Sequence, residues 1–217
     1  IKRVKDTITE EDLAKAIKLI KKSERPMVLV GGGAVTSGAS KELAEFVELI
    51  DAPVCDTLMG KGAYDGTKIN YTGMVGMHGT KASNYAVTEC DLLVAIGARF
   101  SDRVTGNAKK FAKDAKILHI DIDPAEINKN VMTDASVIGD IKEVLKALKK
   151  RIEKKDNDQW VQHIVEYKER CPLRIPEGLS GPYVVNRLYE ATKGDAVIVT
   201  EVGQHQMWAA QFFSYQK

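Results

Sequence analysis

Short runs of consecutive apolar residues alternate along the chain with stretches in which apolar residues recur every three or four positions. The apolar runs lie at 27–30, 53–55, 92–96, 117–122 and 137–138. Runs of this length predict buried strands, and the recurring spacing between them predicts amphipathic helices. Strands that are apolar on both faces and separated by helices are typical of a parallel sheet covered on both sides. We therefore predict a doubly wound α/β domain with about six, mostly parallel, strands.

Three segments differ in character. The sheet domain is predicted to cover residues 1–153, and residues 154–180, with a polar helix and two prolines, are predicted to be an interdomain linker. A second α/β unit is predicted over 181–217, with a helix that has Pro182 in its first turn and a strand at 196–199. The chain does not begin with Met and ends in an aromatic stretch. We expect an internal piece of a longer protein, with its second unit truncated.

Composition excludes several classes of protein. Hydrophobic residues make up 44% and charged residues 29%, as in a folded domain, and the formal net charge of +2 indicates neither a nucleic-acid nor a membrane-surface partner. The three cysteines and four histidines are scattered, so neither a disulfide framework nor a metal site is predicted. Unpaired cysteines, and apolar runs far shorter than the roughly 18 residues of a membrane helix, favour a cytoplasmic protein.

Three consecutive glycines, Gly31–Gly33, follow the first predicted strand. Glycines at such a place allow the backbone to approach a phosphate group near a helix start. The pattern departs from G-x-G-x-x-G, because Thr36 stands where the last glycine would be, and the next predicted helix does not follow at once. The alternative is a tight turn that needs a positive φ angle. The glycines alone leave both interpretations open.

Other predicted strand ends carry related signals: Gly97–Arg103 follows one strand, Asp121 ends another, and Gly139–Asp140 follows the next. In open parallel sheets, ligands bind outside the carboxyl ends of the strands. Arg99 or Arg103 can pair with a phosphate through two hydrogen bonds, and Asp121 can accept hydrogen bonds from ribose hydroxyls. A nucleotide-binding site is therefore favoured over the alternative that these are ordinary turn and loop residues without a ligand.

The stretch Gly73–Thr80 has glycines at three-residue spacing around His78. His78 could act as a general base, but no serine, cysteine or carboxylate motif accompanies it. A backbone loop that holds a flat ligand is the favoured interpretation. His119 lies inside an apolar strand and is predicted to be in the core. Nucleophile-elbow and P-loop motifs and paired catalytic carboxylates are absent from the sequence, so no catalytic residue is predicted.

Four motifs in one order resemble the large subunit of acetolactate (acetohydroxyacid) synthases. They are G-M-H-G-T at 76–80, G-A-R-F-S-D-R-V-T-G at 97–106, H-I-D-I-D-P at 119–124 and T-E-V-G-Q-H-Q-M-W at 200–208. Each match is short, but the ordered set is specific, and the similarity extends over essentially the whole chain. Members of this family condense two 2-keto acids on thiamine diphosphate in valine, leucine and isoleucine synthesis. They also bind FAD, which has no redox role in the main reaction.

The resemblance implies cofactor contacts position by position. The implied FAD-binding residues are Gly31, Gly32, Gly33, Thr57, Leu58, Met77, His78, Gly79, Thr80, Gly97, Ala98, Arg99, Arg103, Asp121, Ile122, Glu126, Gly139 and Asp140. The residues implied near the thiamine diphosphate are Gly203, Gln204 and His205.

Met77, Asp102 and Arg103 match positions that line the substrate and inhibitor channel in relatives. Ser101 and Glu201 stand where relatives often have Asp, which weakens any side-chain role for those two positions.

The family's activating glutamate and its Gly-Asp-Gly…Asn segment, which holds Mg²⁺, are not matched within the 217 residues. The resemblance therefore implies no catalytic residue and no metal ligand in this chain, and no acetolactate formation by it alone. Thiamine diphosphate and Mg²⁺ are expected only in the full-length enzyme. That enzyme is expected to be a homodimer or tetramer with a regulatory small subunit, acting on pyruvate or 2-oxobutyrate.

Two alternative classes remain open. Pyruvate oxidase, glyoxylate carboligase and oxalyl-CoA decarboxylase share the middle-domain plan but not the G-Q-H-Q-M-W motif. A non-catalytic nucleotide-binding module could resemble an electron-transfer flavoprotein or a sirtuin-like deacylase, although the latter usually carries a four-cysteine zinc site, which three dispersed cysteines do not provide.

Overall fold

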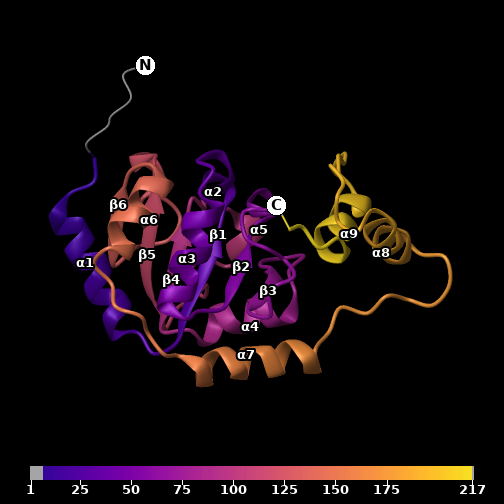
Figure 1. Ribbon diagram of the computed structural model, residues 1–217, viewed down its shortest axis with the longest axis horizontal. Coiled ribbons are helices and arrows are strands. Elements are labelled where there is room, and N and C mark those ends of the chain that lie inside the picture. The colour runs from indigo at the N-terminus through magenta and orange to yellow at the C-terminus, as the bar shows by residue number, and fades with distance from the viewer. Residues whose placement is uncertain (1–6, 217) are drawn as a thin grey trace, which may run out of the picture.

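The computed structural model describes residues 7–216 and contains one six-stranded sheet (Figure 1). Every neighbouring pair of strands is parallel, and the order across the sheet is β3-β2-β1-β4-β5-β6. This confirms the predicted doubly wound α/β fold. The strands are β1 (Pro26–Val30), β2 (Val54–Asp56), β3 (Tyr71–Met74), β4 (Leu92–Ile96), β5 (Lys116–Asp121) and β6 (Ala135–Ile138).

The edge strand β3 lies where the apolar pattern predicted no strand. Its four residues include Gly73, and burial alternates along it, since it pairs only with β2. A short edge strand of this kind carries no continuous apolar run, so the hydrophobic pattern does not reveal it.

Helices cover both faces of the sheet and bury two apolar clusters. One cluster joins α1, α3 and α6 to the sheet, and the other joins α4 and α7 to it. The helices are α1 (Glu10–Lys22), α2 (Gly32–Thr36), α3 (Ser40–Ile50), α4 (Lys81–Glu89), α5 (Asp102–Thr105), α6 (Ile141–Lys149), α7 (Asp158–Arg170), α8 (Gly181–Thr192) and α9 (Gln204–Phe212), with 3-10 turns η1 (Leu58–Gly60) and η2 (Pro124–Glu126). Since helices cover both faces, the loops at the ends of the strands are the part of the sheet where a ligand would bind.

The segment that follows α6 is fastened to the sheet domain rather than free of it. The Lys155 ammonium donates to the carbonyl of Ile20 at the end of α1, and the Asn157 amide donates to the carbonyl of Ile50 at the end of α3. The indole N–H of Trp160 then donates to the Pro26 carbonyl at 2.8 Å. The first half of the predicted linker thus packs on the sheet domain, while the proposed domain boundaries themselves stay a prediction.

The second unit consists of α8 and α9, which pack on each other beside β3 (Figure 1). The strand predicted at 196–199 is wrong for this structure: these residues are irregular, with Val197 92% and Val199 88% exposed. A strand requires a neighbour with which to form ladder hydrogen bonds, and no described residue pairs with this segment. Within residues 7–216, no helix is both long and apolar enough to span a bilayer.

Candidate functional site

Because all six strands are parallel, their carboxyl ends meet at a single edge of the sheet, which we call the carboxyl rim. The rim comprises the residues that end or follow the six strands, 31–33, 57–59, 75–80, 97–103, 121–126 and 139–140. All residues that the resemblance implies for FAD lie along this rim. The strand order reverses between β1 and β4, and such a reversal is the place where doubly wound sheets bind dinucleotides.

Glycines at the reversal bring the two central loops into backbone contact. The Gly33 amide donates to the Gly97 carbonyl at 3.1 Å, and a Cβ atom on Gly31 would lie 2.1 Å from that carbonyl oxygen. Gly31 has φ −109°, so it needs no left-handed conformation, and the alternative of a positive-φ turn is wrong for it. The helix α2 begins directly at Gly32, which corrects the expectation of a delayed helix. Close packing against Gly97 at the reversal therefore explains why positions 31 and 33 require glycine.

The turn after β2 carries Thr57 and Leu58, which are both partly buried. The Thr57 hydroxyl accepts a hydrogen bond from the Gly60 amide and caps η1. The next residue, Met59, is 74% exposed, and its Cβ lies 3.0 Å from where a Cβ on Gly32 would stand. No signal in the sequence points to Met59, because an isolated methionine in a turn carries no pattern.

The loop after β3 is tied to the loop after β4. The Met77 amide donates to the Arg103 carbonyl at 2.9 Å, and the Asn84 side chain both accepts from the Gly76 amide and donates to its carbonyl. Gly76 has φ +102°, and a Cβ there would lie 2.3 Å from the Arg103 carbonyl oxygen, so glycine is required. The Thr80 hydroxyl caps α4.

The structure brings together the three residues predicted for the channel. Met77 is 62% exposed, and the side chains of Asp102 and Arg103 are exposed beside it, with a charge separation of 4.0 Å. The His78 side chain is also exposed, whereas Gly79 packs its backbone near the Met74 carbonyl. This cluster presents an apolar side chain and a cation to the same region of the rim.

In the loop after β4, Arg99 is exposed to solvent while both of its chain neighbours are buried. Ala98 is buried, and Phe100 is buried in a left-handed backbone conformation with φ +49°. The Phe100 ring meets the His119 ring edge-on, with 5.0 Å between centroids, and the Asn130 amide donates to the Arg99 carbonyl. The buried ring anchors the loop, so that the exposed guanidinium beside it is available to an anion.

Carboxylates gather at the β5 and β6 end of the rim. Asp121 is 7% exposed and accepts a hydrogen bond from the Asp123 amide. Burial raises the pKa of Asp121, but the nearby His119 imidazole, whose Nε2 lies 3.7 Å away, and backbone amides outweigh burial, so the pKa is lowered. Asp121 is thus held as a carboxylate that can accept hydrogen bonds.

Glu126 is also buried at this end of the rim. Its Oε1 accepts from Lys129 at 2.9 Å, while Oε2 is buried without a hydrogen-bond partner in the described part of the chain. Ile122, in the same loop after β5, is 64% exposed. Asp140 is exposed and caps α6, and Gly139 packs against Ile8. An unpartnered buried carboxylate oxygen, on the same stretch of the rim as Asp121, suits a ligand that brings hydroxyl donors.

His119 is fully buried, as predicted, and neither ring nitrogen has a hydrogen-bond partner among residues 7–216. The residues predicted near the diphosphate, Gly203–His205, are exposed at the start of α9 and do not lie on the carboxyl rim. In the described part of the chain, no group of three or more His, Cys, Asp or Glu could hold a metal ion.

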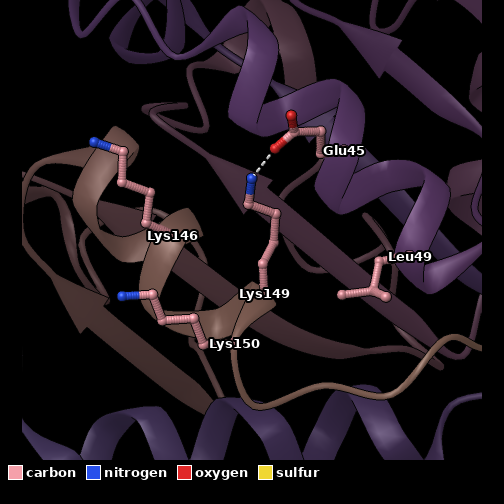
Figure 2. Close-up of a pocket in the computed structure, with 5 residues that line it drawn as sticks. All are labelled: Glu45, Leu49, Lys146, Lys149 and Lys150. Atoms are coloured by element: carbon pink, nitrogen blue, oxygen red, sulfur yellow. Dashed lines mark hydrogen bonds and ion pairs between the residues drawn. The ribbon is translucent and has the colours of Figure 1, made fainter.

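Two surface hollows lie away from the rim. One, between α3 and α6, is lined by Leu49 and three lysines, of which Lys149 pairs with Glu45 (Figure 2). The other lies at the opposite edge of the sheet, beside α1 and the start of β5. Both are bordered by lysines and contain none of the residues that the resemblance implies, so we assign the candidate site to the carboxyl rim.

Comparison with known proteins identifies the family. Residues 13–148 match the family model described as the central domain of thiamine pyrophosphate enzymes. The chain belongs to this family. The resemblance to acetolactate synthase large subunits is also confirmed, since such proteins align with nearly the whole chain.

The probable acetolactate synthase large subunit of Methanocaldococcus jannaschii is 50% identical over 216 residues, covering 93% of this chain and 36% of the relative. The acetolactate synthase large subunit of Cyanidium caldarium is 44% identical, covering 92% and 36%. The chloroplastic acetolactate synthase of Arabidopsis thaliana is 45% identical, covering 96% and 32%. The chain therefore spans about a third of the length of these curated relatives.

Proposed function

We propose that this chain is the FAD-binding central part of an acetolactate synthase large subunit, followed by the first part of its thiamine-diphosphate domain. The observation that carries the proposal is the alignment of the implied FAD residues along one rim, with the strand order reversing at Gly31–Gly33 and Gly97. The relatives named acetolactate synthase supply the enzyme class.

The distribution of side chains along the rim supports one orientation of FAD. Carboxylates stand at the β5 and β6 end, where Asp121 and the unpartnered Glu126 oxygen can accept from ribose hydroxyls. The pyrophosphate would lie at the central reversal, within reach of Arg99. The exposed side chains of Met59 and Met77 follow β2 and β3 and would meet the isoalloxazine ring.

In the family, FAD has no redox role in the main reaction, so the task of these residues is to hold and orient it. The full-length enzyme would condense two pyruvates, or pyruvate and 2-oxobutyrate, with release of CO₂. It would work in the cytoplasm as a homodimer or tetramer with a regulatory small subunit.

Thiamine diphosphate and Mg²⁺ belong to the full-length enzyme in this proposal. Gly203–His205 would approach the diphosphate through a backbone turn and neutral polar side chains. The 217 residues contain no Gly-Asp-Gly segment for the metal. We therefore propose that these 217 residues alone form no acetolactate. Sustained acetolactate production from pyruvate, thiamine diphosphate and Mg²⁺ by the purified chain would contradict this part of the proposal.

Titration of the purified chain with FAD, followed by flavin fluorescence and calorimetry, tests the flavin site. We expect saturable binding, and we expect Arg99→Ala to weaken it about tenfold or more, because a charge-assisted contact with phosphate is lost. Arg174→Ala is the matched control, since Arg174 is exposed in the irregular segment after α7. Binding of NAD⁺ or ADP without binding of FAD would favour the other nucleotide-binding classes.

A further inference from the structure

The helix α9 is attached to the carboxyl rim by a side-chain hydrogen bond. The amide group of Gln211, in the last turn of α9, donates to the carbonyl oxygen of His78 at 2.7 Å. Among residues 7–216 it is the one side chain of the α8–α9 unit that donates to a rim loop. Figure 1 shows α9 on the β3 side of the sheet, where this loop emerges.

Packing around Gln211 keeps the helix in place. Ala209, Ala210 and Phe213 are at most 5% exposed, and the Gly66 amide donates to the Tyr215 carbonyl at 2.8 Å. The position of the end of α9 is therefore stabilised by buried apolar residues and a backbone hydrogen bond that do not involve the Gln211 side chain. Loss of the Gln211 hydrogen bond alone should leave these interactions in place.

The loop that receives this hydrogen bond carries exposed candidate residues. Its links to other elements include the hydrogen bond from the Met77 amide to the Arg103 carbonyl, the Asn84 side chain on Gly76, and the hydrogen bond from the Thr80 hydroxyl to the Thr72 carbonyl. These links tie the loop to α5, α4 and β3. Gln211 ties it to α9, at the residue between Met77 and Gly79.

Gln211 and Gln204 share one face of α9, since seven residues make two helical turns, and they stand about 10 Å apart along the axis. Gln204 is one of the residues implied near the thiamine diphosphate. One face of α9 thus carries both Gln204, which is implied near the diphosphate, and Gln211, which holds the loop 76–80 that contains residues implied for FAD.

We propose that Gln211 is a positioning residue that fixes the 76–80 loop at the ring end of the FAD site and sets its place relative to the start of α9. This rests on the proposed function, because it assumes that FAD lies along the carboxyl rim. Among residues 7–216, the Gln211 side chain hydrogen-bonds only to this loop, so it acts through the position of Met77 and His78.

The test compares Gln211→Ala and Gln211→Glu with the wild-type chain, using FAD and ADP as separate probes. Glutamate has the shape of glutamine, but its carboxylate cannot donate to the His78 carbonyl. We expect both variants to bind FAD up to about tenfold more weakly and to shift the absorbance and fluorescence of the bound flavin. ADP lacks the isoalloxazine ring, so its affinity should not change. Gln206→Ala, on the same helix, should leave both affinities and the spectrum unchanged.

The outcomes distinguish failure of the proposed flavin site from failure of the proposed role of Gln211. If the wild-type chain does not bind FAD at millimolar concentration, the flavin site is wrong and this inference falls with it. If the wild-type chain binds FAD, and the Gln211 variants match it in affinity and flavin spectrum, only the role of Gln211 is overturned. An equal loss of ADP affinity would show a general disturbance of the site and would also overturn the positioning role.

Discussion

The amide of Gly33 donates to the carbonyl of Gly97 at 3.1 Å, which joins the loops after β1 and β4 across the reversal of strand order. A Cβ on Gly31 would lie 2.1 Å from the Gly97 carbonyl oxygen, a distance no side-chain movement can relieve. At Gly32, by contrast, the nearest atoms are the Met59 Cβ at 3.0 Å and the Met59 carbonyl oxygen at 3.3 Å, so a much smaller shift of the η1 turn would make room for a Cβ.

Gly31→Ala and Gly32→Ala should therefore separate packing from ligand approach. We expect Gly31→Ala to lower the free energy of unfolding by about 1–3 kcal/mol or more, because overpacked backbone must shift. Gly32→Ala, at the first residue of α2, should change that energy by less than about 1 kcal/mol but weaken FAD binding. Urea denaturation and FAD titration measure the two effects. Equal loss of stability in both variants would contradict this distinction.

Lys61 and Asp56 form a buried ion pair at the end of β2. Their charged groups are 3.1 Å apart, the Tyr71 hydroxyl donates to Asp56 at 2.7 Å, and the Asp56 side chain is only 2% exposed. Burial raises the pKa of Asp56 despite Lys61 and Tyr71. Lys61→Ala leaves this carboxylate without its cation and should cost about 3–5 kcal/mol of stability.

The paired variant Asp56→Asn, Lys61→Met removes both charges and serves as the comparison. We expect it to recover most of the stability that Lys61→Ala loses, because removing a buried pair is less costly than breaking it. Denaturation curves of the wild type, Lys61→Ala and the double variant measure this. A double variant as unstable as the single one would show that packing, not charge, dominates.

Asp121 should make the stability of the chain depend on pH in the acid range. Its pKa is lowered in the folded protein, so the folded state binds fewer protons than the unfolded state once the pH falls below about 4. The resulting stability is fully present above that pH and is lost as the pH falls through the folded-state pKa. The difference in unfolding free energy between wild type and Asp121→Asn should accordingly shrink below about pH 4. A difference that stays constant into strong acid would contradict the assignment.

Two of the three cysteines should resist modification in the folded chain. Burial raises the pKa of Cys90 to about 12 and that of Cys55 well above its usual value, whereas Cys171 is only partly buried. Because the thiolate is the reactive form, a disulfide reagent should titrate one thiol rapidly and the other two only after unfolding. Cys171→Ser should abolish the rapid phase. Rapid reaction of this variant would show that Cys55 or Cys90 becomes accessible in the folded state.

The sequence alone predicted the sheet of parallel strands, because its inner strands are buried on both faces and read as unbroken apolar runs. It also predicted the burial of His119, since this residue lies inside an apolar run. The edge strand β3 escaped prediction, since pairing with one neighbour needs no apolar run. The segment 196–199 has the composition of a strand but no partner among the described residues, so composition misled there.

The candidate site divides in the same way. Glycine, arginine and aspartate at successive strand ends indicated a nucleotide rim, because parallel strands place all their carboxyl ends on one side. Tertiary structure alone decided that Gly31 and Gly33 serve backbone packing against Gly97, that Phe100 anchors the Arg99 loop, and that Gln211 reaches His78. These relationships join residues distant along the chain, and a distance between two such residues depends on how the intervening helices pack, which local patterns do not specify.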